Sequence, residues 1–109
     1  MSSLSEINFY GGVLSNRIDL LLDIPLMQQK ENLVQDIAQI SYLNGKVLVD
    51  IGWYPADMEI SDFSHFKFYV IKNMDWDNPV AIFSCSDIFE FKEHLDKTIQ
   101  FALNLSQSV

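Results

Sequence analysis

The sequence has one cysteine, few basic residues and no long apolar run, and each shortage excludes a class of protein. The single cysteine, Cys85, cannot form an internal disulfide in this chain of 109 residues, which excludes a disulfide-stapled secreted fold. The segment Met1–Glu6 has neither a basic start nor an apolar stretch, so we expect no signal peptide. Apolar runs stay far below the roughly 18 residues that span a bilayer. We therefore expect a cytoplasmic protein.

Basic residues are scarce, because seven Lys and Arg face fifteen Asp and Glu. The formal net charge is −8 and the isoelectric point is near 4.4. Nucleic acid would be repelled, since its affinity for proteins comes largely from Lys and Arg that neutralise phosphates. An anionic membrane surface would be repelled as well. Basic proteins and peptides gain from such a field, although acidity also serves solubility alone.

Patterns typical of catalytic and metal sites are missing. The only residues that could form a Cys–His nucleophile–base pair are Cys85 with His65 or His94. A following helix would lower the pKa of the Cys85 thiol, but a small buried residue at a strand end is the simpler interpretation. No His-x-x-x-His or Cys-x-x-Cys pair is present, and the segment 75–78 lacks the Gly and Glu of a calcium loop. We expect no catalytic residue, no metal and no cofactor.

The first 45 residues favour helices. Leu33, Ile37 and Ile40 recur at helical spacing, and Asn44–Gly45 is a good helix stop. Pro25 either opens a second helix or kinks one long helix. The composition is 49% hydrophobic and 13% aromatic. That is enough for one packed core, and the length suits a single domain over residues 1–109.

The middle of the chain changes to period two, which is typical of strands. The segments 47–54, 65–72 and 80–84 read as three strands with short connections. After them, Asp87 and Glu90 fit a capping pair at the start of an amphipathic helix. We expect an α+β fold with N-terminal helices, a three-stranded antiparallel meander and a C-terminal helix, in the order α-α-β-β-β-α.

Negative charge gathers in two connections of this meander. The loop 55–64 carries three acids and the turn 73–79 carries two, and neither carries a base. Loops are polar by default and turns attract Asp, yet the first loop also holds apolar side chains and the turn places a Trp between aspartates. An exposed indole there would be an anchor for Lys or Arg, and one folded onto the core would not. The candidate partner-binding residues are Asp57, Glu59, Asp62, Asp75, Trp76 and Asp77.

In a simple meander the two acidic connections lie at opposite ends of the sheet, roughly 25 Å apart for strands of seven or eight residues. A partner face of standard size, about 800 Å² per side, could just reach both of them. We therefore expect one connection to contact the partner and the other to remain free.

Three segments carry a resemblance to a known family. They are Gly52-Trp53-Tyr54-Pro55 at a strand end, the Phe-rich strand 66–71, and the segment 75–80 before the closing helix. Over roughly residues 47–105 this pattern resembles small immunity proteins of bacterial polymorphic-toxin and contact-dependent growth inhibition systems.

The resemblance implies a cytoplasmic protein that binds the toxin domain of a cognate effector and blocks its active site. Many such toxins are nucleases with basic clefts, which an acidic immunity protein would occupy as a phosphate mimic. The family carries over no catalytic or binding residue to this chain, so the candidate residues rest on charge alone. A non-enzymatic acidic adaptor or a secretion chaperone is the alternative.

Overall fold

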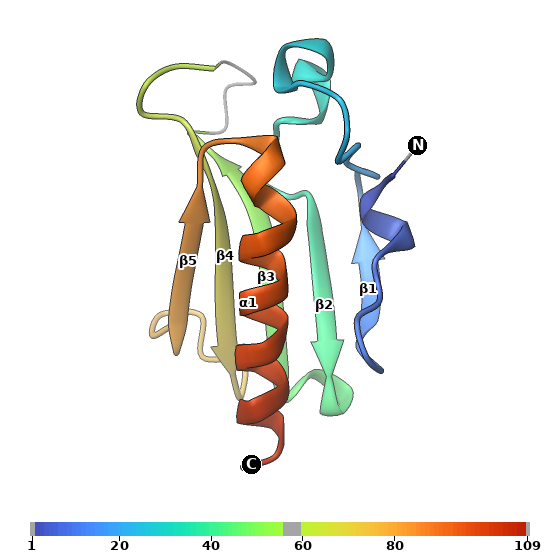
Figure 1. Cartoon of the computed structure of the whole chain (residues 1–109). Helices are drawn as coiled ribbons and strands as arrows, with labels where there is room; N and C mark the ends of the chain where they lie inside the picture. Colours follow the sequence, from blue (N-terminus) through green and yellow to red (C-terminus); the bar gives the residue numbers. More distant parts are fainter. Residues whose placement is uncertain (1, 56–59, 109) are drawn as a thin grey trace.

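A computed structural model describes residues 2–55 and 60–108. The chain forms a five-stranded antiparallel sheet whose strands lie side by side in sequence order, with one long helix across one face (Figure 1). The strands are β1 (Val13–Asn16), β2 (Ala38–Tyr42), β3 (Val47–Tyr54), β4 (His65–Lys72) and β5 (Ala81–Cys85), and the helix is α1 (Ile88–Ser106). Single 3-10 turns span Leu4–Glu6, Leu26–Gln28, Lys30–Asn32 and Leu43–Gly45.

The predicted order α-α-β-β-β-α is wrong, because the N-terminal helices are absent from the described chain. Two strands and four 3-10 turns take their place, so the order of the longer elements is β-β-β-β-β-α. The three predicted strands and the C-terminal helix are present, with β5 starting one residue later than expected. Asp87 caps α1, since its Oδ1 accepts a hydrogen bond from the N–H of Phe89 at 2.9 Å.

The residues assigned to helices are buried, but in an extended chain. Leu33, Ile37 and Ile40 are fully buried. In β2 the burial alternates between buried and half-buried residues, which is the period of a strand. Tertiary pairing explains this outcome, because β3 would otherwise present an unpaired edge to the solvent. Asn44 and Gly45, with φ of 54° and 91°, form the left-handed turn between β2 and β3 rather than a helix stop.

A bulge between β2 and β3 explains the helix-like spacing. The N–H of Trp53 donates to the carbonyl oxygen of Val34 at 2.8 Å, and the N–H of Ile37 donates to Ile51 at 3.0 Å. Residues 35–36 therefore bulge out opposite Gly52, as extra residues in one strand do. The spacing of four between Leu33 and Ile37 reflects this bulge and not a helical turn.

The long connection between β1 and β2 is held by one side chain. Gln29 is 1% exposed, and its Nε2 donates to the carbonyl oxygens of Leu21 at 2.7 Å and Ile24 at 3.0 Å. Its Oε1 accepts from the N–H of Leu21 at 3.1 Å. These bonds satisfy the buried Gln29 amide and, in turn, part-buried backbone groups that a helix would have satisfied internally.

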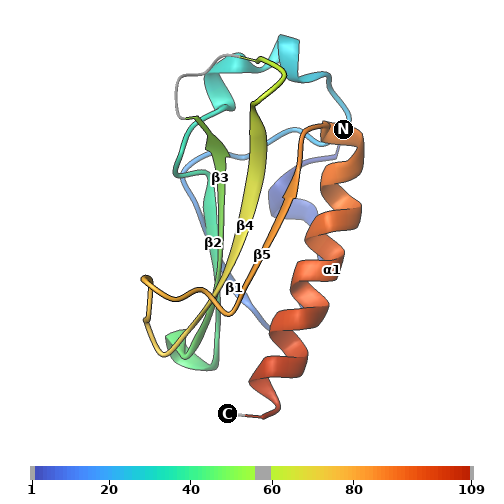
Figure 2. The ribbon, with the colours of Figure 1, turned by 90° about the vertical axis from the view of Figure 1, so that its left-hand side faces the viewer.

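The core lies between the sheet and α1, and it is dominated by aromatic side chains. The ring of Phe91 on α1 lies 4.9 Å from Phe66 and 5.1 Å from Phe68, and Phe66 lies 4.8 Å from Trp53. All four are fully buried. The N-terminal segment, with Leu4 buried, packs beside α1 over the same face (Figure 2). The opposite face carries no described helix, and we call it the open face; β3 and β4 place Leu48, Asp50, Tyr54, Lys67, Tyr69 and Ile71 there.

No described helix, α1 included, combines the length and the apolar character that crossing a bilayer requires.

Gly52→Ala tests the bulge. The carbonyl oxygen of Gln35 occupies the position that a Cβ at residue 52 would take, so the bulge must shift. We expect the free energy of unfolding to fall by about 2–3 kcal/mol in urea titrations. Ser84→Ala, on the exposed side of β5, is the control and should change it by less than about 0.5 kcal/mol. Equal stability of Gly52→Ala and wild type would contradict the bulge.

Candidate partner-binding surface

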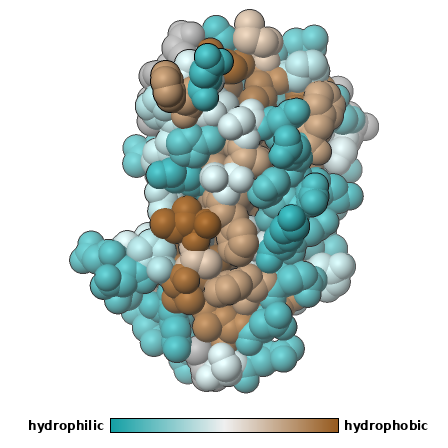
Figure 3. Space-filling model, turned by 60° about the vertical axis from the view of Figure 1, so that its left-hand side comes forward, coloured by the Kyte–Doolittle hydropathy of each residue, from teal (hydrophilic) through white to brown (hydrophobic). Residues whose placement is uncertain are grey.

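The connection between β4 and β5, residues 73–80, carries three of the six predicted binding residues, and we call it the acidic tip. Asn73 and Met74 have φ of 54° and 60°, which turns the chain sharply after β4. The amide of Asn78 lies 3.3 Å from both carboxylate oxygens of Asp75 and holds the turn from within. The acidic tip curls toward the open face (Figure 2) and stands out from the body as a mainly hydrophilic protrusion (Figure 3).

Trp76 lies at the middle of the acidic tip, between the exposed Asp75 and Asp77. The residue is 44% exposed, so part of the indole faces solvent and the rest packs against the protein. Below the tip, Leu48 and Ile71 are only 4% and 1% exposed, although α1 lies on the other side of the sheet. This end of the open face is therefore buried although α1 does not cover it, and Trp76 on the nearby acidic tip keeps part of its surface in solvent.

The other predicted acidic loop lies at the opposite end of the sheet, as the meander predicted (Figure 1). Asp62 is exposed there, and Phe63 beside it is 85% exposed. Asp57 and Glu59 lie outside the described residues. An eight-residue strand, roughly 25 Å long, separates the two ends. The structure thus brings the three tip residues together and keeps them apart from Asp62.

The middle of the open face is not among the predicted binding residues, and it is polar and aromatic. Strand pairing places Asp50 between Gln39 on β2 and Tyr69 on β4. The Lys67 ammonium lies 5.4 Å from the ring centre of Tyr54 and 5.8 Å from that of Tyr69, within cation–π range. Period two already assigns these β3 and β4 side chains to one face. What the sequence does not reveal is that no described helix covers that face.

Asp50 borders a hollow of about 170 Å³. Burial raises the pKa of Asp50 to about 6; the negative charge of Asp36 adds to this rise, and a hydrogen bond from Gln39 opposes it. Arg17 pairs with Asp36 at 3.7 Å, but both side chains are largely exposed, so this pair contributes little. A cation from a partner would favour the charged form of Asp50. The lining residues are Ser15, Arg17, Asp36, Ala38, Gln39 and Asp50.

Cys85 does not have the environment of an activated nucleophile. The residue is 7% exposed, and burial raises the pKa of its thiol to about 12, with the charge of Glu90 adding to the rise. Its Sγ lies 3.8 Å from the carbonyl oxygen of Asp87, too weak a contact to reverse the effect. The sequence left open that the start of α1 lowers the pKa of this thiol, and the structure shows the opposite shift. The thiol therefore stays protonated at neutral pH.

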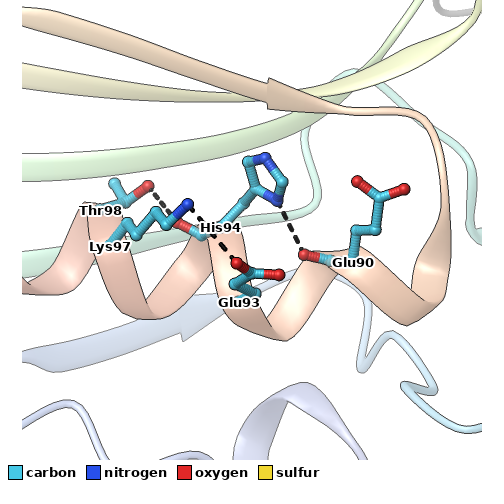
Figure 4. Close-up of polar contacts among 5 residues, drawn as sticks. All are labelled: Glu90, Glu93, His94, Lys97 and Thr98. Atoms are coloured by element: carbon cyan, nitrogen blue, oxygen red, sulfur yellow. Dashed lines mark hydrogen bonds and ion pairs between the residues drawn. The ribbon is translucent and has the colours of Figure 1, made fainter.

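The histidines bond to backbone carbonyls of their own segments. Nδ1 of His94 lies 2.9 Å from the carbonyl oxygen of Glu90 on α1 (Figure 4), and Nδ1 of His65 lies 2.8 Å from that of Phe63. Within residues 2–55 and 60–108, no three His, Cys, Asp or Glu side chains are grouped so as to hold a metal ion.

No protein-family model matches the sequence, and no curated protein or solved structure matches it either. The resemblance to immunity proteins therefore stays a prediction. Two of the residues that carry it have structural roles, because Trp53 is fully buried in the core and Gly52 makes room for the bulge.

Asp50→Asn tests the buried carboxylate. The folded-state pKa of about 6 lies above the ordinary 3.8, so the stability that Asp50 contributes is present below about pH 4 and is lost as the pH rises through 6. Asn carries no charge. Relative to wild type, the variant should therefore gain roughly 1–2 kcal/mol in free energy of unfolding between about pH 4 and pH 7.5, allowing for solvent screening.

Urea unfolding at the two pH values measures this gain, with Asp62→Asn on the exposed loop as the control. If the difference in free energy of unfolding between Asp50→Asn and wild type is the same at both pH values, folding does not disfavour the charged form of Asp50.

Proposed function

We propose that this protein binds a basic protein partner and neutralises it by covering its functional surface, as an immunity protein does with a toxin domain. The half-exposed Trp76 between two exposed carboxylates carries the proposal. Trp is the residue most enriched at the energetic centre of protein interfaces. Its ring face attracts Lys and Arg, and flanking carboxylates add charge-assisted hydrogen bonds to the same cations.

The carboxylates of the acidic tip are not neutralised by a basic side chain among the described residues. Among the described residues, neither Asp75 nor Asp77 forms an ion pair, and the side-chain partner of Asp75 is the neutral amide of Asn78. Their negative charge is therefore not compensated within the described chain. A net charge of −8 extends this field and would speed the approach of a basic partner.

The open face adjoins the acidic tip and supplies the remaining contact area. The five strands lie about 4.8 Å apart and average six residues, or roughly 20 Å, so this face is about 20 Å wide and has an area near 400 Å². With the tip, this approaches the ~800 Å² per side of a standard interface. Asp50 and Tyr69 are paired in its middle, and Tyr54 lies at the far end of β3, so aromatic and acidic groups extend across the sheet, with Lys67 near both tyrosine rings.

A nuclease toxin is the partner that this chemistry fits best. A cleft that holds a phosphate backbone presents Lys and Arg side chains, and carboxylates spaced along a protruding turn can pair with them. Masking the cleft requires no catalytic group in the inhibitor. The raised pKa of Cys85 and the backbone-bonded histidines agree with a binding role.

Charge reversal at the acidic tip is the direct test. The probe is the purified C-terminal domain of the protein encoded directly upstream of this gene. Wild type should form a 1:1 complex whose association rate falls at least tenfold between about 50 and 500 mM NaCl. Asp75→Lys with Asp77→Lys should weaken binding about 100-fold or more, and Trp76→Ala about 30-fold, because both remove contacts at the interface centre.

Glu93→Lys with Asp96→Lys makes the same change in net charge on the exposed side of α1, and it should weaken binding less than tenfold. Circular dichroism checks that each variant is folded. If both double variants lose the same amount of binding affinity, net charge explains the loss and the position of the charges does not. No loss at the tip would move the interface to the loop of Asp62, and binding only to an unfolded segment would favour a secretion chaperone.

A further inference from the structure

The sheet ends in two edge strands, β1 and β5. Beyond β1, the N-terminal residues pair with the continuing chain, since Leu4 donates to Leu20 at 2.9 Å and Leu22 donates to Ser2 at 3.0 Å. β5 pairs with β4 on one side, and no described segment lies along its other side (Figure 1). In such an edge strand, alternate N–H and C=O groups point away from the sheet and can accept another strand.

β5 also lacks the residues that usually prevent edge pairing. Its sequence, Ala-Ile-Phe-Ser-Cys, contains no Lys, no Pro and no other charged residue. Protected edges carry charges, prolines, bulges or a covering segment. The five residues of β5 therefore form an accessible edge along which a further strand can hydrogen-bond.

Apolar side chains continue on both sides of this edge. On the open-face side Ile82 is 54% exposed, and Val80 just before the strand is 43% exposed. On the helix side the rings of Phe83 and Phe101 lie 5.9 Å apart and line a groove of about 510 Å³ between β5 and α1. Figure 3 shows the resulting hydrophobic stripe on the side of the molecule that carries β5.

The charges beside this groove are largely satisfied along α1. Lys97 pairs with Glu93 at 3.5 Å, four residues earlier on the same helix (Figure 4). Gln100 and Asn104 are neutral, which leaves Asp96 as the remaining charge on the groove's rim. The groove therefore offers apolar contact with little charge selectivity, unlike the acidic tip.

We propose that β5 is the interface of a homodimer, in which the β5 strands of two copies pair antiparallel about a two-fold axis at Phe83. The two five-stranded sheets then form one sheet of ten strands. In this register Phe83 lies opposite its own copy, and Ile82 lies opposite Ser84 of the partner subunit. No like charges and no prolines meet, so the edge is complementary to itself, as a two-fold interface requires.

The size of the contact indicates that the dimer is weak and reversible. A five-residue strand is roughly 17 Å long and a helix-on-sheet layer is about 20 Å thick, which gives about 350 Å² per copy. The total of about 700 Å² is below the roughly 1,200 Å² of a stable specific interface, so we expect a weak, transient dimer with a dissociation constant of roughly 10–100 µM. The acidic tip curls toward the open face, so both copies keep a tip for a basic partner.

Salt distinguishes this association from binding of a basic partner. Two copies of net charge −8 repel each other, and salt screens the repulsion while it leaves apolar contact intact. The dimer should therefore become tighter as salt rises, whereas a complex with a basic protein becomes weaker. The dimer does not depend on the proposed function, and either can fail without the other.

Sedimentation equilibrium of the full chain, from about 5 to about 500 µM, tests the dimer. The average mass should rise from 12.6 kDa toward twice that value, with a several-fold lower dissociation constant in ~500 mM than in ~50 mM NaCl. Ile82→Lys should weaken association at least tenfold, since a lysine on an edge strand blocks pairing. Ser84→Lys, on the same exposed side of β5, should do the same.

Val13→Lys is the matched control, because it replaces an exposed apolar residue at the other edge of the sheet and changes the charge equally. It should dimerise at least as well as wild type. A mass of 12.6 kDa at the highest concentration in ~500 mM NaCl would overturn the proposal. Equal association of the Ile82 and Val13 variants, or association that weakens with salt, would overturn it as well.

Discussion

The packing of Phe91 against Phe66 and Phe68 determines which face of the sheet is covered, and the surface features follow from it. A single helix can bury only one face, so the alternate side chains of β3 and β4 divide into an aromatic core and an open face. On the open face, Asp50 keeps a carboxylate in a half-buried position. The acidic tip lies at the end of that face where Leu48 and Ile71 are buried, and Trp76 on it is half exposed.

Where local pattern and tertiary packing agree, the sequence predicts the fold. Period-two spacing of the large apolar side chains predicts β3 and β4, and the Asp87 cap marks the start of α1. The first 45 residues could not be predicted in this way, because the spacing of Leu33 and Ile37 comes from a bulge against β3. That bulge depends on a contact with Gly52, far along the chain, which no local window contains.

The candidate site divides in the same manner. The acidic tip is visible in the sequence, because three adjacent residues supply its charge and its indole. The open face is not, since Asp50 and Tyr69 become neighbours only through strand pairing. The free edge at β5 is hidden for a related reason: an edge is defined by which strand lacks a neighbour, and that requires the whole topology.

Recognition of a basic protein through the acidic tip and the open face is the central claim of this account. Chemical-shift mapping of the ¹⁵N-labelled protein, titrated with the purified C-terminal domain of the protein encoded directly upstream, tests this claim most directly. The account predicts that the largest shifts cluster at residues 73–80 and along the open face at Asp50, Tyr54 and Tyr69. Shifts confined to the exposed side of α1, or to the far loop at Asp62, would contradict it.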